Sequence, residues 1–257
     1  MPKVNAKKGL GQHFLTDKNI ARKIVNSTVP GNFNSIVEIG PGTGVLTNFI
    51  LEWNFPNFSA VELDRESIEY LKKQYSDQAE SFIFGDFLIY PLEQHEAPVA
   101  LIGNLPYFIS SQIFFRALEY RGIVNQMVFM IQKEVAERIA SPPGNKTYGI
   151  LSVLLQAYYD IEYLFTVHEH CFSPAPKVKS AVIRLIRNNT DTLQCNHSSF
   201  HKVVKASFNK RRKTIRNSLR SIFLNLPAES ELLTMRPEQL SVGQFVELAC
   251  LIEKLNP

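Results

Sequence analysis

The stretch that most constrains the fold of this chain is Ser35–Gly44. Ser-Ile-Val-Glu-Ile is an apolar run that predicts a short buried strand, and it leads directly into Gly-Pro-Gly-Thr-Gly. A helix is expected to follow, from about Val45 through Leu51. A strand, a glycine loop and a helix together bring backbone N–H groups and a helix N-terminus against a ligand, as in doubly wound α/β folds. Because turns also use glycine for positive φ, this segment alone is weak support for a ligand site.

Acidic residues at the ends of the first two predicted strands indicate the kind of ligand. The spacing Gly-x-Gly-x-Gly differs from the Gly-x-Gly-x-x-Gly of pyrophosphate sites, and Glu38 stands just before the first glycine. A pyrophosphate would not favour a carboxylate there, whereas a ligand with an ammonium group would. The second strand, over residues 58–63, carries Glu62 at close to the roughly 20-residue spacing at which an acid meets ribose hydroxyls. The alternative for Glu62 or Asp64 is capping of a helix over residues 65–75.

A third predicted strand, Ser81–Phe84, is followed by Gly85, Asp86 and Phe87. The acid and the aromatic side chain could bind an adenine amine and cover the face of its ring. The alternative is an Asp turn without a ligand. Beside the two preceding strand ends, this segment favours a nucleoside ligand at the carboxyl edge of a parallel sheet.

A fourth apolar run, Val99–Gly103, ends in Asn104, Leu105, Pro106 and Tyr107. Pro106 cannot donate to a sheet ladder, so the strand stops there. The stop leaves an amide, freed backbone carbonyls and an aromatic face side by side. Carbonyl oxygens accept the N–H protons of an exocyclic amine while the base stacks on Tyr107, so the group suits a planar base. The alternative is a strand-ending turn in which Asn104 caps its own backbone.

Alternating helices and strands complete the predicted α/β sheet. Ser110 or Ser111 is expected to cap a helix, and further helices are expected over residues 132–140 and 148–158. Strands are expected over residues 123–131, 160–167 and 180–186. Before the last strand, Pro174 and Pro176 stiffen a loop and could hold Phe172 outward. The alternative is that Phe172 is a core aromatic residue under this loop.

Composition argues against several other classes of protein. The chain is 45% hydrophobic and 20% charged, as in ordinary soluble globular proteins. Its apolar runs are far shorter than the roughly 18 residues of a membrane span, and no apolar signal segment opens the chain. Three widely spaced cysteines without Cys-x-x-Cys predict a reduced, cytoplasmic chain without a structural metal. We expect a monomer that binds neither metal nor membrane.

The net charge of +4 is concentrated in the C-terminal segment. Residues 188–257 contain 10 Lys and Arg against 6 Asp and Glu, whereas residues 1–187 contain 18 of each. The sequence also turns polar at Arg-Asn-Asn-Thr, from residue 187 to 190. We therefore expect an α/β domain over residues 1–187 and a small, basic, helical domain over residues 188–257 that helps to hold a polyanion partner.

Within the second domain, Ser199–Arg220 carries eight cations and no acid. An apolar stripe at helical spacing accompanies them: Phe200, Val203, Val204, Phe208, Ile215 and Leu219. Cations outside and apolar residues inside form a face suited to a polyanion. Its candidate residues for binding a nucleic acid or another acidic surface are Lys210, Arg211, Arg212, Lys213 and Arg216. Lys7 and Lys8, in a basic arm over residues 1–16, are further candidates, and the alternative for the arm is a frayed terminus.

Seven motifs in this order resemble those of the KsgA family of small-subunit ribosomal RNA adenine N6,N6-dimethyltransferases. They are Gly-Gln-His-Phe-Leu, Glu-Ile-Gly-Pro-Gly-Thr-Gly, Val-Glu-Leu-Asp, Gly-Asp-Phe, Asn-Leu-Pro-Tyr-x-Ile-Ser, Phe-Ser-Pro-x-Pro-Lys-Val-x-Ser-Ala-Val and Phe-Asn-Lys-Arg-Arg-Lys-Thr-Ile-Arg-Asn-Ser-Leu. Each is modest alone, but together they are highly specific and run along nearly the whole chain. The related large-subunit (Erm) methyltransferases usually have Asn-Ile-Pro-Tyr and lack the Arg-Arg-Lys-Thr-Ile-Arg run.

The resemblance implies a Rossmann-like, S-adenosylmethionine-dependent methyltransferase sheet with a small all-helical C-terminal domain. It implies that residues 1–187 form a methyltransferase catalytic domain and residues 188–257 an RNA-binding domain, so that the partner of the basic residues is RNA. It implies contacts to the methyl donor S-adenosylmethionine from His13, Leu15, Glu38, Gly40, Gly42, Glu62, Asp86, Phe87 and Asn104. Glu62 would accept both ribose hydroxyls, Asp86 the adenine amine of the cofactor, and Glu38 would organise the glycine loop and the methionine end. The family varies between Asn and His at position 13, so a backbone contact is the expectation there.

The resemblance also implies methyl transfer to N6 of two adjacent adenosines in small-subunit (16S) ribosomal RNA, within a pre-ribosomal small subunit. The expected catalytic residues are Asn104, Leu105, Pro106, Tyr107 and Phe172. The Asn104 carbonyl and a Leu105 or Pro106 backbone carbonyl would accept the amine protons, and Tyr107 and Phe172 would sandwich the extruded base. Three alternatives stay open: an Erm-type large-subunit methyltransferase, a nicotinamide-dependent oxidoreductase, and a non-catalytic ribosome-assembly factor.

Overall fold

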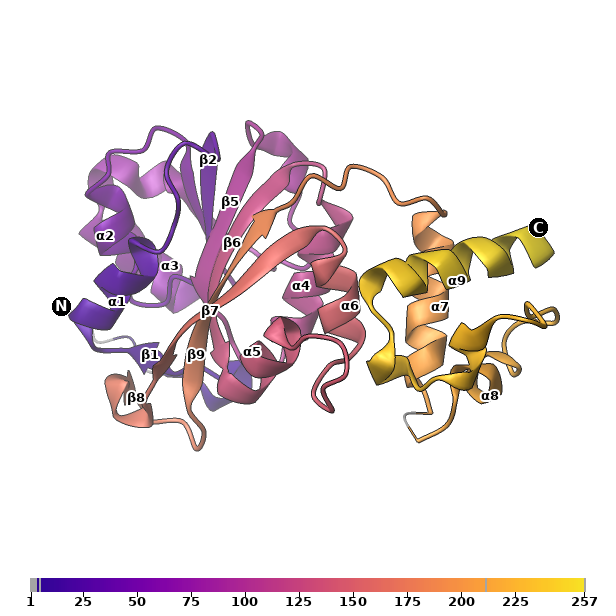
Figure 1. Cartoon of the computed structure of the whole chain (residues 1–257). Coiled ribbons are helices and arrows are strands. Elements are labelled where there is room, and N and C mark those ends of the chain that lie inside the picture. The colour runs from indigo at the N-terminus through magenta and orange to yellow at the C-terminus, as the bar shows by residue number, and fades with distance from the viewer. Residues whose placement is uncertain (1–3, 5, 211, 257) are drawn as a thin grey trace. The chain divides into compact units, whose positions relative to one another are not determined.

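Figure 1 shows the computed structural model of the chain, in which residues 4, 6–210 and 212–256 are described. Within these residues, seven strands form the main sheet in the order β4-β3-β2-β5-β6-β9-β7. Their bounds are β2 Ser35–Ile39, β3 Phe58–Glu62, β4 Phe82–Phe84, β5 Val99–Asn104, β6 Val124–Gln132, β7 Tyr159–Val167 and β9 Ser180–Arg187. Strands β4 to β6 in this order are parallel, and β9 is antiparallel to β6. The predicted α/β sheet is therefore confirmed.

Strand β2 lies at the centre of the parallel part of the sheet, between β3 and β5. Val37 of β2 pairs with Ser59 of β3 on one side and with Leu101 of β5 on the other. The chain continues from β2 to β3 and β4 in one direction and to β5 and β6 in the other. Strand order therefore reverses between β2 and β5, and ligands of open α/β sheets bind beyond the carboxyl ends of the strands at such a reversal.

Helices pack on both faces of this sheet, which explains why its strands are continuous apolar runs. These helices are α1 Lys18–Val25, α2 Thr47–Leu51, α3 Arg65–Gln74 and α4 Ser110–Glu119, and a further helix, α5 Lys133–Ala140, directly follows β6. Ile24 of α1 shares a buried cluster with Ile102 of β5 and Met130 of β6. Phe129 points to the opposite face, because side chains alternate along a strand, and there it packs edge-on against Phe114 of α4 at 5.5 Å.

Helix caps follow the sequence in one case and not in another. Asp64 caps α3 by accepting a hydrogen bond from Glu66 N, as expected. The cap expected from Ser110 or Ser111 is wrong, because α4 begins at Ser110 with Ile109 as N-cap and without a side-chain cap bond. Ser110 Oγ instead donates to Tyr107 O at 3.1 Å, which ties the start of α4 to the turn after β5.

A second, two-stranded sheet joins the N-terminal arm to the loop that follows β7. Its strands, β1 (Phe14–Leu15) and β8 (Phe172–Ser173), are antiparallel, with Leu15 opposite Phe172. Thr16 adds two hydrogen bonds, from its backbone N and its Oγ1 to Cys171 O, at 2.8 and 2.9 Å. These bonds give the arm a defined place beside the main sheet.

Gly103 lets β2 and β5 come close together at their carboxyl ends. A Cβ atom at this position would lie 2.5 Å from Ile39 O, closer than real Cβ atoms come to backbone. The last residues of β2 and β5 can therefore lie side by side only because residue 103 has no side chain.

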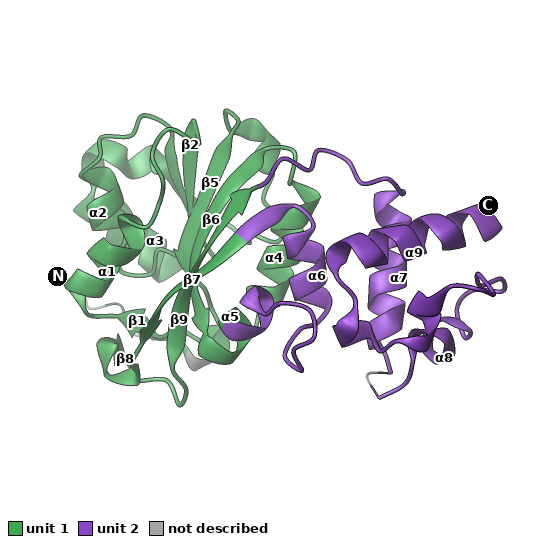
Figure 2. Cartoon of the chain, viewed as in Figure 1, with its two compact units in different colours: residues 1–136, 161–187 green, residues 137–160, 188–257 purple. Residues whose placement is uncertain are grey.

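By its internal contacts the chain divides into two compact units, coloured in Figure 2: residues 1–136 with 161–187, and residues 137–160 with 188–257. One division follows Arg187, where the expected linker begins, but residues 137–160 group with the C-terminal helices. Helix α6 (Ile150–Gln156) is the reason, since it is largely buried and packs on α7 (His197–Phe208) and α9 (Val242–Leu255).

In the second unit, the described residues of the basic stretch 199–220 lie mainly in two helices and the segment between them. Helix α7 ends at Phe208, and α8 spans Ile215–Leu219. The predicted apolar stripe is buried at each of its six positions, and Phe208 stacks on Phe245 of α9 with ring centroids 5.9 Å apart.

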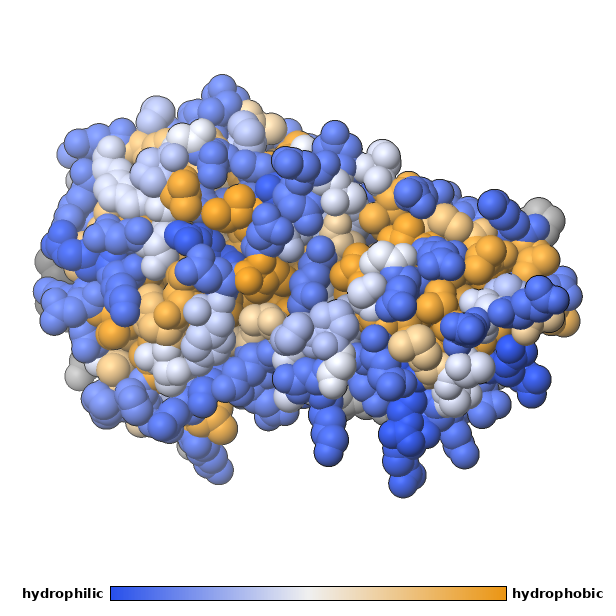
Figure 3. Space-filling view, in the orientation of Figure 1, coloured by the Kyte–Doolittle hydropathy of each residue, from blue (hydrophilic) through white to orange (hydrophobic). Residues whose placement is uncertain are grey.

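The face of the molecule that Figure 3 shows is mainly polar. Figure 3 shows hydrophilic side chains over most of the visible face of both units, with apolar groups in small separate patches. Among the described residues, no helix is long and apolar enough to cross a membrane. The three cysteines, Cys171, Cys195 and Cys250, are free thiols.

Candidate active site

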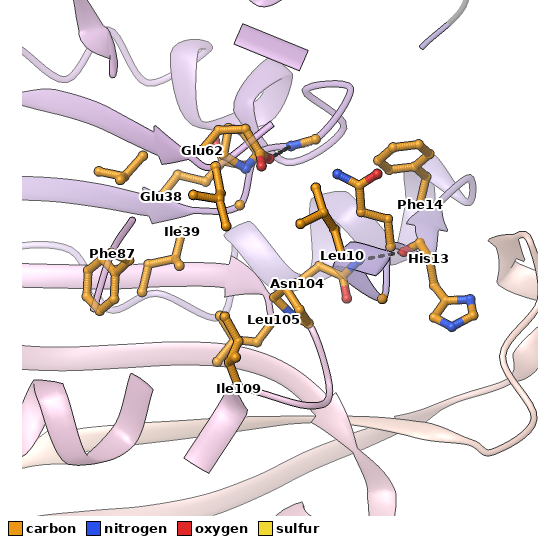
Figure 4. A pocket seen from close by; sticks show the side chains of 18 of the residues that line it. Leu10, His13, Phe14, Glu38, Ile39, Glu62, Phe87, Asn104, Leu105 and Ile109 are labelled. Carbon is orange, nitrogen blue, oxygen red and sulfur yellow. Dashed lines mark hydrogen bonds between the residues drawn. The ribbon is translucent and has the colours of Figure 1, made fainter. Parts of the chain in front are cut away.

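The first unit contains a pocket at the carboxyl ends of β2, β3, β4 and β5, the edge where the sequence placed its acidic and amide residues. The pocket has an empty volume of about 980 Å³ and opens to solvent. It is lined by nearly all the residues that were predicted to bind cofactor or target base: His13, Leu15, Glu38, Gly40, Gly42, Glu62, Asp86, Phe87, Asn104, Leu105, Pro106 and Tyr107. Figure 4 shows how several of them lie around the cavity.

The glycine loop brings bare backbone to the pocket. Gly40 and Gly42 have φ of 65° and 55°, a left-handed region that side chains disfavour. A Cβ at Gly40 would meet nothing within 4 Å, whereas a Cβ at Gly42 would lie 2.9 Å from the Phe14 ring. The first glycine thus leaves open space for a ligand, and the second makes room for the N-terminal arm.

Glu38 is a buried carboxyl at the end of β2, only 1% exposed. Thr47 Oγ1 donates a hydrogen bond of 2.6 Å to its Oε2. Burial raises the pKa of Glu38 to about 8, the Thr47 hydroxyl opposes this rise, and the nearby Glu62 carboxyl adds to it. Without a cationic ligand, Glu38 is therefore mainly protonated at neutral pH.

Glu62, at the end of β3, braces the glycine loop. Its Oε2 accepts from Gly42 N at 3.0 Å and its Oε1 accepts from Asp64 N at 2.9 Å. Burial raises its pKa above the ordinary value, while these backbone N–H groups oppose the rise. A carboxylate oxygen has more than one lone pair, so both oxygens can still accept from a ligand hydroxyl.

Asp86 and Phe87 follow β4, as predicted. Asp86 Oδ1 accepts from Leu88 N at 2.9 Å, which closes the Asp turn given above as the alternative, and Asp86 also lines the pocket. Phe87 is buried and lines the same cavity, where its ring can cover a base.

Asn104 ends β5, and its orientation is set by the arm. Its Nδ2 donates to His13 O at 3.0 Å, drawn as a dashed line in Figure 4. Because a carbonyl oxygen only accepts, the amide nitrogen must face His13, which leaves Asn104 Oδ1 as a hydrogen-bond acceptor for a ligand.

The turn after Asn104 supplies the remaining groups. Leu105 N donates to Met130 O at 3.0 Å, and Pro106 O accepts from Ile109 N at 3.3 Å. The phenol of Tyr107 bonds Ser180 Oγ at 2.6 Å, and burial raises its pKa above the ordinary value. The Tyr107 ring is therefore fixed in place beside the amide.

Lys7 has a different partner from the RNA phosphate that was expected. Its Nζ lies 2.6 Å from Asp64 Oδ1 and 3.3 Å from Glu66 Oε2, at the start of α3. Burial alone would raise the pKa of Asp64, but Lys7 and Ser67 hold it below the ordinary value. Lys7 thus fastens the arm near Glu62. The side chain of Lys8 lies outside the described residues.

Phe172 does not stand outward as the flanking prolines suggested. It is 5% exposed and belongs to the main buried cluster, because β8 pairs with β1 and turns this side chain into the core. It is not among the residues that line the pocket. The expectation of a free Phe172 face is corrected in favour of the core alternative.

The basic candidates of the second unit lie between α7 and α8 and on α8. Lys210, Arg212 and Lys213 are exposed, while Arg216 is half-buried and donates to Ala228 O at 3.1 Å. Arg211 lies outside the described residues.

The N-terminal arm contributes more residues to the pocket than the sequence predicted. Leu10, Gly11, Gln12 and Phe14 all line it, together with Phe108, which is 61% exposed at the turn after β5. A two-residue strand such as β1 has no periodicity to detect, so the only available signal was the Gly-Gln-His-Phe-Leu motif itself.

The fold and the pocket together define a class of protein. A mixed seven-stranded sheet, a glycine loop at the strand reversal and acids at three strand ends are the features of an S-adenosylmethionine-dependent methyltransferase. The family follows from the sequence: the family model described as ribosomal RNA adenine dimethylase matches residues 3–254, so the chain belongs to that family.

Similar proteins cover the whole chain. It is 53% identical over 255 residues to the ribosomal RNA small subunit methyltransferase A of Cytophaga hutchinsonii, covering 98% of this chain and 99% of that one. It is 52% identical over 254 residues to the protein of the same name from Phocaeicola vulgatus, covering 97% and 90%.

Solved structures show the same fold at low identity. A dimethyladenosine transferase from Plasmodium falciparum superposes with a TM-score of 0.77 at 21% identity, over 94% of this chain and 98% of that one. The 23S rRNA methyltransferase ErmE superposes with a TM-score of 0.65 at 22% identity, over 93% and 99%.

Proposed function

We propose that the protein transfers methyl groups from S-adenosylmethionine to N6 of adenosines in small-subunit ribosomal RNA. The observation that carries this proposal is the Asn104 amide, whose nitrogen is bound to His13 O and whose oxygen is left for an amine. The family supports adenine as the acceptor, and the two curated relatives support the small subunit.

The residues of the pocket fit S-adenosylmethionine. Bare backbone at Gly40 opens space for it, and Glu62 can accept its ribose hydroxyls. Asp86 has an oxygen for its adenine amine, and the buried Glu38 carboxyl suits the ammonium of its methionine end. When bound, the cofactor supplies an electrophilic methyl group.

The protein's own groups act on the acceptor amine. The lone pair of adenine N6 is delocalised into the ring, so this nitrogen is a poor nucleophile. Asn104 Oδ1 and the Leu105 carbonyl accept hydrogen bonds from its two N–H groups. These bonds favour the transition state, in which the lone pair is localised on the nitrogen. Acceptors fixed in advance contribute on the order of 2–4 kcal/mol each, by analogy with oxyanion holes. Leu105 is a better second acceptor than Pro106, whose carbonyl already accepts from Ile109 N.

Tyr107 holds the extruded base. Its phenol is fixed by Ser180, so the ring offers a rigid platform, and one stacked base contributes roughly 1–3 kcal/mol. Phe172 is buried in the core, so we assign it no part in stacking on the base.

RNA binding uses the exposed cations of the second unit. Lys210, Arg212 and Lys213 carry the excess charge of a segment without acids, which suits phosphate contacts.

The residues that line the pocket all lie between Leu10 and Ile109 of one chain, so a monomer can form the pocket. Its substrate, a pre-ribosomal small subunit, implies action in the cytoplasm.

Mass spectrometry of RNA tests this function. Purified protein and S-adenosylmethionine are incubated with pre-ribosomal small subunits and, separately, with large-subunit RNA. We expect N6,N6-dimethyladenosine in the small-subunit RNA only. Methylation of large-subunit RNA alone would support the Erm-type alternative, and binding of small subunits without any methylation would support the assembly-factor alternative.

A further inference from the structure

We propose that the His13 side chain is a positioning residue for the target adenine, acting on Tyr107 and on the loop at Pro174 and not on the cofactor. The inference rests on the proposed function, because it concerns the acceptor side of the same pocket.

His13 joins three parts of this acceptor side. Its carbonyl accepts from Asn104 Nδ2 at 3.0 Å, and its ring stacks on Tyr107 with centroids 5.7 Å apart and planes inclined by 26°. Its Nδ1 lies 2.8 Å from Pro174 O, and since a carbonyl only accepts, Nδ1 carries the proton and donates. One residue of the arm thus contacts the amide, the aromatic platform and the loop after β8.

The direction of the ring separates it from the cofactor contacts. Figure 4 shows the His13 ring pointing away from Glu38 and Glu62, with the Asn104 amide lying between the ring and these carboxyls. A side chain that served the ribose or the methionine end would face those carboxyls.

Tyr107 is therefore held from two directions. Ser180 of β9 fixes its phenol at 2.6 Å, and His13 covers one face of its ring. A base can then stack on the opposite face, with its amine toward Asn104 Oδ1. The bond to Pro174 keeps the His13 ring in this position by tying it to the same loop that pairs with the arm.

Three variants separate the two interactions of the side chain. His13→Asn keeps an amide donor near Nδ1 and removes the ring, His13→Phe keeps the ring and removes the donor, and His13→Ala removes both. Each variant keeps the backbone carbonyl that binds Asn104. His168→Ala, which removes an exposed histidine outside the pocket, is the matched control.

The readouts are cofactor affinity by calorimetry and kcat and KM for methylation of small-subunit RNA. His13→Asn loses the aromatic pair and His13→Phe loses the hydrogen bond, so we expect kcat/KM to fall roughly twofold to tenfold in each of these two variants. We expect a loss of about tenfold to a hundredfold for Ala, with the Kd for S-adenosylmethionine within about twofold of wild type throughout.

Each outcome decides the proposal. If cofactor affinity falls together with kcat/KM, the His13 side chain serves the cofactor. If the kinetics of all three variants are unchanged, only the His13 backbone matters. Either result overturns this inference and leaves the proposed function standing. If wild type methylates only large-subunit RNA, the proposed substrate is wrong, and the variants are compared on that RNA because adenine N6 is again the acceptor. Methylation of neither RNA by wild type would overturn both proposals.

Discussion

The Asn104 amide nitrogen lies 3.0 Å from the carbonyl oxygen of His13, although the two residues are 91 positions apart in the chain. This bond keeps Oδ1 directed to the acceptor, so Asn104→Ala removes an interaction that strengthens in the transition state. We expect the single-turnover methylation rate to fall by about a hundredfold to a thousandfold, with little change in cofactor affinity. A rate loss explained entirely by weaker cofactor binding, as calorimetry would show, would contradict this role.

Glu62→Ala should weaken S-adenosylmethionine binding and leave RNA binding nearly unchanged. The variant loses an acceptor for the ribose hydroxyls and also releases the N–H groups of Gly42 and Asp64 that the carboxylate holds. Calorimetry with the cofactor and filter binding with small-subunit RNA measure the two effects separately. The exposed Glu69 of α3 provides the control variant Glu69→Ala, and equal cofactor affinities for both variants would mean that Glu62 is only a brace.

Lys7→Gln should shorten the lifetime of the bound cofactor. Lys7 joins the arm to Asp64 at 2.6 Å, and the arm residues from Leu10 to Leu15 form one wall of the pocket. Without the ion pair the arm opens more often, so we expect the dissociation rate of S-adenosylmethionine in stopped-flow experiments to rise roughly twofold to fivefold. The same substitution at the exposed Lys18 of α1 should leave the rate unchanged, and equal rates for both variants would exclude a fastening role.

The buried carboxyl of Glu38 should lower the stability of the ligand-free protein as pH rises. Its pKa is raised from 4.5 to about 8, so between these values the folded chain keeps a proton that the unfolded chain has lost. The free energy of unfolding therefore decreases across this window, and Glu38→Gln removes that dependence. From pH 5 to 8 we expect urea unfolding to show the variant gaining roughly 3–4 kcal/mol relative to wild type. A difference between the two proteins that does not change with pH would contradict a raised pKa.

Replacing Arg212 and Lys213 by Gln should weaken RNA binding and reduce its salt dependence. Both are exposed, and each phosphate contact that is lost lowers the slope of log affinity against log salt by roughly 0.7–0.9. The free energy of unfolding should barely change, since exposed charges contribute little to stability. Lys72 and Lys73, exposed on α3, give the matched control pair. An unchanged slope would place the RNA on another surface.

Much of the site could be predicted because its residues lie at the carboxyl ends of parallel strands that are neighbours in the sheet but distant in the sequence. Burial on both faces makes β2, β3 and β5 apolar runs, and each run has a polar residue at or next to its last position: Glu38, Glu62 and Asn104. Parallel pairing then brings these ends to one edge, so their proximity follows from the topology alone.

The parts that could not be predicted depend on short segments and on backbone groups. Strands β1 and β8 have two residues each, too few for alternation to show which side chain points inward, and Phe172 was misjudged for this reason. The His13 carbonyl that orients Asn104 carries no sequence signal, because every residue has one. The grouping of α6 with α7 and α9 is a matter of tertiary packing, which local composition at residue 187 does not record.

The missing side chain at Gly103 has a consequence for what evolution can change in this enzyme. With Ile39 O only 2.5 Å from where a Cβ would be, even alanine would wedge β5 away from β2. Strand β2 leads into the glycine loop, proposed above for the methyl donor, and β5 leads into the Asn104 amide, proposed for the acceptor. In that proposal the wedge would lengthen the path that the methyl group must cross. The distance between the two proposed substrate positions thus depends on an absent methyl group, and we expect substitutions at this position to slow the proposed methyl transfer.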